Sequence, residues 1–206
     1  MKKIFKTIYR ITLILIGIYG LYLNFKMGNI YNLLHYYTIL SNILVIVFFT
    51  YLLFSKKDHI LFKSATTMCI ILTFLVFHFV LRPTMFSMDN TYCLLSPSNL
   101  IVHYIIPIMT FIDYLIFDIK GKLKNFYPLL WAIIPYVYFI IMTINGALGY
   151  TFYDDTHYPY FFMDYDALGV GKVLINVLLL TLFYILLGYI YYGVDYLLKK
   201  LRKKYD

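Results

Sequence analysis

Apolar residues in this chain fall into six long runs that are separated by short polar stretches. The runs cover residues 8–26, 32–54, 64–82, 97–117, 127–145 and 169–192. Each run is close to the roughly 20 residues that an α-helix needs to cross the hydrocarbon core of a bilayer. The pattern predicts an all-α polytopic membrane protein, in which residues 1–206 form a single domain of six transmembrane helices.

Composition supports this class and argues against another. The chain has 206 residues, of which 62% are hydrophobic and 21% aromatic, whereas an average soluble domain is about half apolar. The formal net charge of +8 would suit a nucleic-acid-binding protein. The basic residues, however, lie between the apolar runs, where membrane topology requires them, so we expect no nucleic-acid partner.

Basic residues also predict the orientation of the helices. The N-terminal segment, the second-to-third and fourth-to-fifth connections and the C-terminal tail hold all Lys and Arg except Lys26, Arg82 and Lys172. Because Lys and Arg concentrate on the cytoplasmic side, both termini are expected to be cytoplasmic. The abundance of Lys, Ile, Tyr, Phe and Asn is typical of an AT-rich bacterial genome, so the expected location is a bacterial inner membrane.

Polar residues interrupt the fourth run in a regular way. Asn99, His103 and Pro107 recur at four-residue steps, which places them on one stripe of a helix. An ionisable side chain within a membrane span is costly, so His103 marks a candidate functional site. Asp113 lies near the cytoplasmic end of the same run, where we expect it to reach water or a neighbouring tyrosine.

A second polar stripe is predicted in the second run. His35, Thr38, Ser41 and Asn42 share a face by their three- and four-residue spacing. Thr38 is expected about 9 Å, and His103 about 8 Å, inside the outer ends of their helices. The two stripes are therefore predicted to meet at the same depth.

A hydroxyl beside an imidazole is the minimal equipment for acyl transfer. Thr38 is the candidate nucleophile and His103 the candidate general base. An oxyanion stabiliser is also needed, and Asn99, Asn42 and Arg82 are available donors among which the sequence does not choose. The opposing interpretation is that Thr38 only bonds the carbonyl of the preceding turn.

Other residues are assigned to the surroundings of this pair. Ser41 is expected to orient it, and Asp164 to supply a charged partner from the outer loop. That loop, residues 150–166, is expected to act as a lid. The predicted substrate pocket consists of His35, His78, Pro107, Tyr158 and Tyr160.

At these residues the chain resembles a known family. The segments HYYTILSNILVIV, NLIVHYIIPIMTFIDYLIF and HYPYFFMDYDALG look like those of a bacterial family of six-helix membrane proteins. That family is similar to the eukaryotic androgen-induced-gene and androgen-dependent TFPI-regulating proteins. The resemblance extends from about Leu33 to Leu187.

The resemblance implies an activity and a pair of catalytic residues. The eukaryotic proteins are intramembrane threonine hydrolases that cleave fatty acid esters of hydroxy fatty acids. Their threonine corresponds to Thr38, and their asparagine, histidine and proline correspond to Asn99, His103 and Pro107. The histidine-to-proline distance is one residue shorter here, and Leu100 replaces a second histidine of the eukaryotic pattern. The implied function is hydrolysis of a lipid ester drawn from the bilayer, without a cofactor.

Two other classes of function remain open. A zinc-dependent hydrolase would use His78, His103, His157 and Asp164 as ligands, although no tight ligand spacing supports it. A non-enzymatic protein would bind or transport a small polar ligand, or hold haem between His78 and His103.

Overall fold

The computed structural model describes residues 2–55, 57, 59–84, 95–152 and 156–205. Within these ranges the chain forms helices and turns, with no strand. Six helical segments are long and apolar enough to cross a membrane, which confirms the all-α class and the six predicted spans. These segments are Lys3–Met27, Tyr37–Phe54, Ile60–Thr84, Pro97–Phe117, Tyr127–Ala147 and Tyr165–Arg202.

The chain divides into two compact units, Met1–Ile119 and Lys120–Asp206. Each unit is described by itself, and the expectation that all six helices form one domain stays a prediction.

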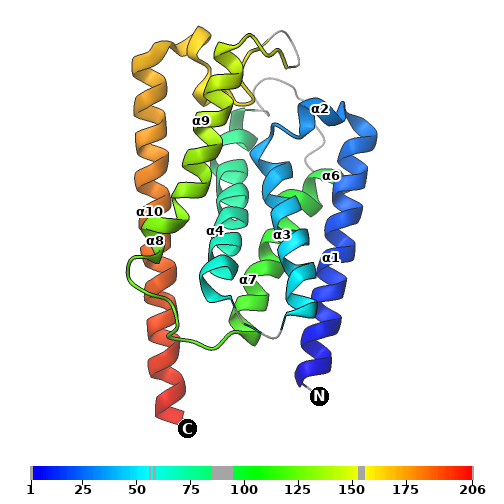
Figure 1. Ribbon diagram of the computed structural model, residues 1–206, viewed down its shortest axis with the longest axis vertical. Helices are drawn as coiled ribbons and strands as arrows, with labels where there is room; N and C mark the ends of the chain where they lie inside the picture. Colours follow the sequence, from blue (N-terminus) through cyan, green and yellow to red (C-terminus); the bar gives the residue numbers. More distant parts are fainter. Residues whose placement is uncertain (1, 56, 58, 85–94, 153–155, 206) are drawn as a thin grey trace. The chain divides into compact units, whose positions relative to one another are not determined.

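Four helices of the first unit, which can be followed in Figure 1, pack as a ring in which each contacts two neighbours. Helices α1 (Lys2–Met27) and α4 (Ile60–Val76) each pack against both α3 (Tyr37–Phe54) and α7 (Ile106–Phe117). The described part of the unit also contains short segments, among them α2 (Ile30–Leu33), α6 (Pro97–Leu100) and the π-helical turns η1 (Phe77–Leu81) and η2 (Ile101–Ile105).

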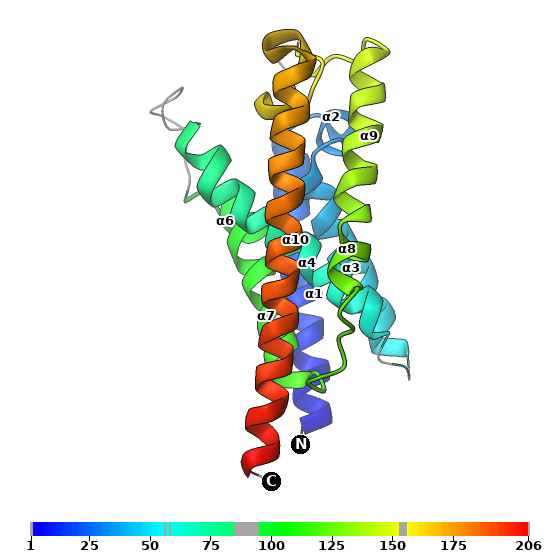
Figure 2. The same ribbon diagram turned by 90° about the vertical axis from the view of Figure 1, so that its left-hand side faces the viewer.

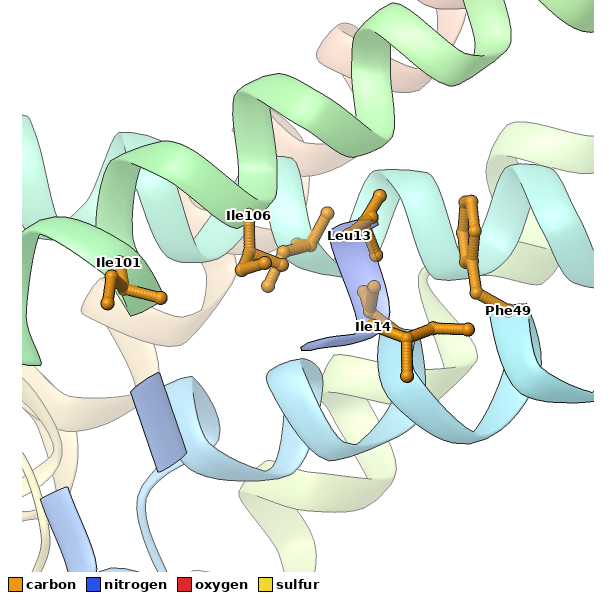
Figure 3. Packing of buried hydrophobic residues seen from close by; sticks show 7 residues of the cluster. Leu13, Ile14, Phe49, Ile101 and Ile106 are labelled. Carbon is orange, nitrogen blue, oxygen red and sulfur yellow. The ribbon is translucent and has the colours of Figure 1, made fainter. Parts of the chain in front are cut away.

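Aliphatic side chains and one phenylalanine fill the interior of this ring. Figure 3 shows Leu13 and Ile14 of α1 beside Phe49 of α3, with Ile101 and Ile106 from η2 and α7 completing the cluster. Leu13, Phe49 and Ile106 are fully buried. For helices that are apolar enough to cross a membrane, close packing between side chains, and not burial from water alone, stabilises such a ring.

The second span begins later than predicted. The chain leaves α2 in a turn, in which His35 N–H donates to the Asn32 carbonyl, and Tyr36 is extended with φ −81° and ψ 131°. Helix α3 therefore begins at Tyr37, not at residue 32, and Thr38 is its second residue. The expected depth of Thr38 inside a longer helix is wrong, because the polar turn before Tyr37 breaks that helix.

The second unit contains α8 (Tyr127–Trp131), α9 (Ile133–Ala147), the short 3₁₀ turn η4 (Phe161–Met163) and the long α10 (Tyr165–Tyr205). Helices α9 and α10 run side by side in both Figure 1 and Figure 2, joined by a cluster that includes Met142, Tyr158, Met163 and Val173.

Two features explain how the helices of this unit begin and bend. The break between α8 and α9 falls at Ala132, one turn before Pro135, because proline lacks an N–H and its ring crowds the carbonyl four residues earlier. Asp164 accepts hydrogen bonds from the N–H groups of Asp166 and Ala167, both at 3.0 Å, and so caps α10. Gly169, with φ 74° and ψ 161°, then kinks α10 in a conformation that side chains disfavour.

A buried ionic cluster ties three helices of the first unit together. Arg10 of α1 binds the Asp113 carboxylate of α7 with two hydrogen bonds, of 2.9 and 3.1 Å. Lys63 of α4 also bonds Asp113, and it bonds Asp118 at the end of α7. The expectation that Asp113 reaches water or a tyrosine is wrong, because its side chain is 0% exposed and is held by two cations.

The cluster predicts a large effect of one substitution on stability. Asp113→Asn leaves Arg10 and Lys63 buried with one carboxylate fewer, and breaking a buried pair from one side costs about 3–5 kcal/mol. We expect a markedly lower unfolding temperature in detergent for this variant. Asp166→Asn, at an exposed carboxylate, is the matched control and should unfold like the parent. Equal unfolding temperatures of the two variants would contradict the structural role of Asp113.

Candidate active site

The structure brings Thr38 and His103 together in the first unit. The Oγ1 atom of Thr38 lies 3.3 Å from the Nε2 atom of His103. The two side chains belong to residues that are only 9% and 8% exposed, between the start of α3 and the π-helical turn η2. Because α3 begins at Tyr37, the Leu34 carbonyl lies outside this helix, and the Thr38 hydroxyl contacts the imidazole instead.

A backbone carbonyl orients the imidazole. The Nδ1 atom of His103 lies 3.1 Å from the Asn99 carbonyl oxygen. A carbonyl only accepts, so Nδ1 carries the proton and, in the neutral ring, Nε2 keeps the lone pair that faces Thr38. This tautomer is the one in which Nε2 can take the proton of the Thr38 hydroxyl.

An aromatic ring fixes the plane of the same imidazole. The Phe77 ring stacks on His103 with a centroid distance of 3.6 Å and an interplanar angle of 13°. Phe77 begins η1 and His103 lies within η2, so both partners of the stack are in π-helical turns. Such turns are rare and often occur at functional sites. The ring of Phe77 and the carbonyl of Asn99 together leave the imidazole little freedom to rotate.

The π-helical turn and Pro107 together free one backbone carbonyl next to the histidine. Ile106 N–H donates to the Ile101 carbonyl, five residues back, and not to that of Val102. The next residue is Pro107, which has no N–H to offer. The Val102 carbonyl instead accepts a 3.0 Å hydrogen bond from Nδ2 of Asn42 on α3.

Asn42 is therefore a clamp between the two helices that carry the pair. Its Nδ2 atom also donates to the Thr38 carbonyl, at 2.8 Å. Both N–H bonds of the amide are thus used, which leaves Asn42 no donor for an oxyanion. Its Oδ1 atom is buried without a hydrogen-bond partner in the described part of the chain, in a residue that is 0% exposed.

Ser41 supports the nucleophile through the backbone. Its hydroxyl donates to the Thr38 carbonyl at 3.0 Å, and it lies 2.7 Å from the Thr73 hydroxyl of α4. Ser41 and Asn42 hold the same carbonyl from two sides, so the first turn of α3 is fixed to both α4 and η2. The orienting role of Ser41 in catalysis stays a prediction.

The start of α3 supplies a feature that the sequence did not reveal. The first N–H groups of a helix have no partner within the helix, and the positive end of the helix dipole lies there. Tyr36 at the cap position makes no side-chain capping bond. The backbone N–H of Thr38 itself, second in the helix, is therefore a candidate oxyanion donor that belongs to the nucleophile's own residue.

Other predicted residues of the first unit lie at distinct places. His78 bonds the Tyr104 hydroxyl at 3.1 Å, and this tyrosine ring packs edge-on against Phe77. His35 donates from Nδ1 to the Tyr31 carbonyl at 2.7 Å and precedes α3, so it is not on the helical face of Thr38. Arg82 follows the last residue of η1.

The remaining predicted residues belong to the second unit. Asp164 caps α10, and Tyr158 packs against α9 at Gly146, where a Cβ atom would lie 2.2 Å from the tyrosine ring. Burial, followed by the Asp166 carboxylate, raises the pKa of the Tyr158 hydroxyl, so it stays protonated. The ring of Tyr160 stacks on that of Phe162. Residues 153–155 of the expected lid lie outside the described residues.

The ligands proposed for zinc do not gather in the described part of the chain. There, no group of three or more His, Cys, Asp or Glu side chains is placed to hold a metal ion. His157 instead pairs with Asp166, at 2.7 Å.

Comparison with models of protein families, with curated protein sequences and with solved structures finds no match to this chain. The assignment of a function therefore depends on the geometry of the site and on the sequence motifs.

The role of Asn42 predicts that a second substitution, at Pro107, restores part of the stability lost when Asn42 is replaced. Asn42→Leu leaves the buried Val102 carbonyl without a donor, which costs about 1–3 kcal/mol. Adding Pro107→Ala restores an N–H five residues after Val102, so the double variant should regain part of the lost unfolding free energy. Denaturant unfolding in detergent measures both effects. Pairing Asn42→Leu with Pro135→Ala, a proline of the other unit, should give no rescue, and equal behaviour of the two pairs would contradict the mechanism.

Proposed function

We propose that the protein is an intramembrane hydrolase of lipid esters, with Thr38 as nucleophile and His103 as general base. The observation that carries the proposal is the 3.3 Å contact between Thr38 Oγ1 and His103 Nε2, in a ring whose other nitrogen is bonded to the Asn99 carbonyl. A nucleophile, a base and a group that orients the base are the three parts of activated hydroxyl catalysis. The contact is slightly long, as is common before substrate binds.

The first half of the reaction transfers the acyl group to the protein. Thr38 Oγ1 attacks the ester carbonyl carbon while Nε2 of His103 takes the hydroxyl proton. The negative charge on the carbonyl oxygen is stabilised by the N–H of Thr38 and the start of α3. When the C–O bond of the ester breaks, Nε2 returns its proton to the leaving alcohol, and an acyl-threonine remains.

The second half releases the acid. Water attacks the acyl carbon while Nε2 removes one of its protons, and the same proton then passes to Thr38 Oγ1 as the acyl bond breaks. A fatty acid leaves and the threonine hydroxyl is regenerated. Throughout, the Asn99 carbonyl holds Nδ1–H and keeps the ring in one orientation. It takes the place of the carboxylate in a Ser–His–Asp triad, and as a neutral group it stabilises the imidazolium less.

The substrate class follows from the surroundings and from the motifs. The pair lies in helices that are long and apolar enough to cross a membrane, so an ester carried by acyl chains can approach it laterally from the bilayer. The resemblance to the androgen-induced-gene family adds fatty acid esters of hydroxy fatty acids as a specific candidate. The distribution of Lys and Arg supports an orientation with both termini cytoplasmic, and the abundance of Lys, Ile, Tyr, Phe and Asn supports a bacterial inner membrane.

A fluorophosphonate probe that labels serine and threonine hydrolases tests the proposal. We expect labelling of the full-length protein in detergent, mapped to Thr38 by mass spectrometry. Thr38→Ala should abolish labelling, and His103→Ala should slow it by about 10²–10⁴-fold, the usual contribution of a general base. Hydrolysis of a long-chain fatty acid ester should fall in parallel.

The control is another buried threonine. Thr67 lies on α4 with its hydroxyl bonded to the Lys63 carbonyl, so Thr67→Ala should keep full labelling and hydrolysis. Variants are compared only if they unfold at the temperature of the parent. Hydrolysis that survives in a well-folded Thr38→Ala variant, or a label on Ser41, would refute the assignment.

A further inference from the structure

The loop after α7 and the end of α10 bring basic residues together in the second unit. Residues 120–126 and 195–202 contain six basic side chains and one acidic one, Asp195. The basic residues are Lys120, Lys122, Lys124, Lys199, Lys200 and Arg202. The two stretches are about 70 residues apart in the sequence, so only the fold makes them one surface.

Two contacts fasten the loop to the helix. The Leu123 N–H donates to Oδ2 of Asp195 at 3.2 Å. Gly121 has φ +73°, and a Cβ atom there would lie 2.0 Å from Cδ of Lys199. The aliphatic stem of Lys199 therefore lies directly on the backbone of the loop. These contacts fix the loop lysines beside those of the helix.

The fastening also determines which charges face outward. Asp195 is 1% exposed and its carboxylate is directed to the loop backbone. Five basic side chains are exposed: Lys122, Lys124, Lys199, Lys200 and Arg202. The outer surface of this region, which we call the basic end, is therefore cationic.

The length of α10 places the basic end at the edge of a bilayer. From the kink at Gly169 to Tyr205 the helix runs for about 54 Å at 1.5 Å per residue, whereas the hydrocarbon core is about 30 Å thick. Its long apolar run ends at about Tyr192, and the charged residues Asp195, Lys199, Lys200 and Arg202 follow within the next three turns. The ammonium group of Lys200 lies 4.7 Å from the ring centre of Tyr196, a residue type that favours the interface.

We propose that the basic end binds the phosphate headgroups of anionic phospholipids in the leaflet that it faces. Topology and the helix dipole account for basic residues at this terminus. Neither topology nor the dipole requires contacts between the loop and α10. These contacts let one headgroup bind ammonium groups from the loop and from the helix. Clusters of four to eight basic residues next to a membrane helix are typical of such recognition. The binding is independent of the proposed hydrolase activity.

Native mass spectrometry of the full-length protein tests this by counting phosphatidylglycerol and phosphatidylcholine molecules retained from doped detergent micelles. We expect preferential retention of phosphatidylglycerol, weakened by salt. Each lysine near a charged surface contributes about fivefold to binding, so replacing four should weaken phosphatidylglycerol binding at least tenfold. The test variant is K122Q/K124Q/K199Q/K200Q.

The control removes the same number of charges elsewhere. It replaces four exposed lysines outside the basic end, as K3Q/K26Q/K57Q/K172Q, and should retain phosphatidylglycerol like the parent. An equal loss in both variants would show an effect of net charge alone and overturn the proposal, as would full retention in the test variant.

Two half-variants keep the test decisive if the fourfold variant does not fold. K122Q/K124Q changes the loop alone, and K199Q/K200Q changes the helix alone. Each should weaken binding at least threefold, because headgroups contact both stretches. Full binding by K122Q/K124Q would show that the loop takes no part, and the proposal would then fail.

Discussion

The candidate site depends on one hydrogen bond from a side chain to a backbone carbonyl. Lipid offers no hydrogen-bond donor, so a carbonyl within a membrane span that loses its helical partner needs another within the protein. The π-helical turn and Pro107 deprive the Val102 carbonyl of its partner, and Nδ2 of Asn42 replaces it. Because the same amide holds the Thr38 carbonyl, satisfying the backbone of one helix also sets the position of the hydroxyl on the other.

The hydroxyl–imidazole pair is thus assembled mainly by backbone atoms. The Asn99 carbonyl orients the base, the Thr38 carbonyl receives two side-chain donors, and Thr38 itself is the second residue of α3. Backbone amide and carbonyl groups do not ionise, so this arrangement orients His103 without burying a carboxylate beside it. The buried charges of the first unit are gathered instead in the cluster of Arg10, Lys63 and Asp113.

The six spans could be predicted because each is a long apolar run, and that signal is strong. The start of α3 at Tyr37 could not be predicted, because the apolar pattern continues across residues 32–54. Tyr36, which precedes the helix, is not a residue type that marks a helix start. Thr38 and His103 do lie together, although not through the helical depth expected for Thr38, and their catalytic roles stay predictions. The π-helical turns have no sequence signal of their own. The partners of Asp113 lie 50 and 103 residues away, so Arg10 and Lys63 look like topology signals when the sequence is read alone.

The ionic cluster of the first unit has a further consequence for a protein in an energised membrane. Moving one elementary charge through 100 mV is worth about 2.3 kcal/mol, so a buried charge without compensation would respond to the membrane potential. Arg10 and Lys63 carry two positive charges, and Asp113 and Asp118 carry two negative ones. Arg10 contacts Asp113, and Lys63 contacts both carboxylates. The sum is zero. A uniform electric field therefore does no net work when these four side chains shift together along the membrane normal, and the cluster gives the packing of α1, α4 and α7 no net charge on which the voltage could act.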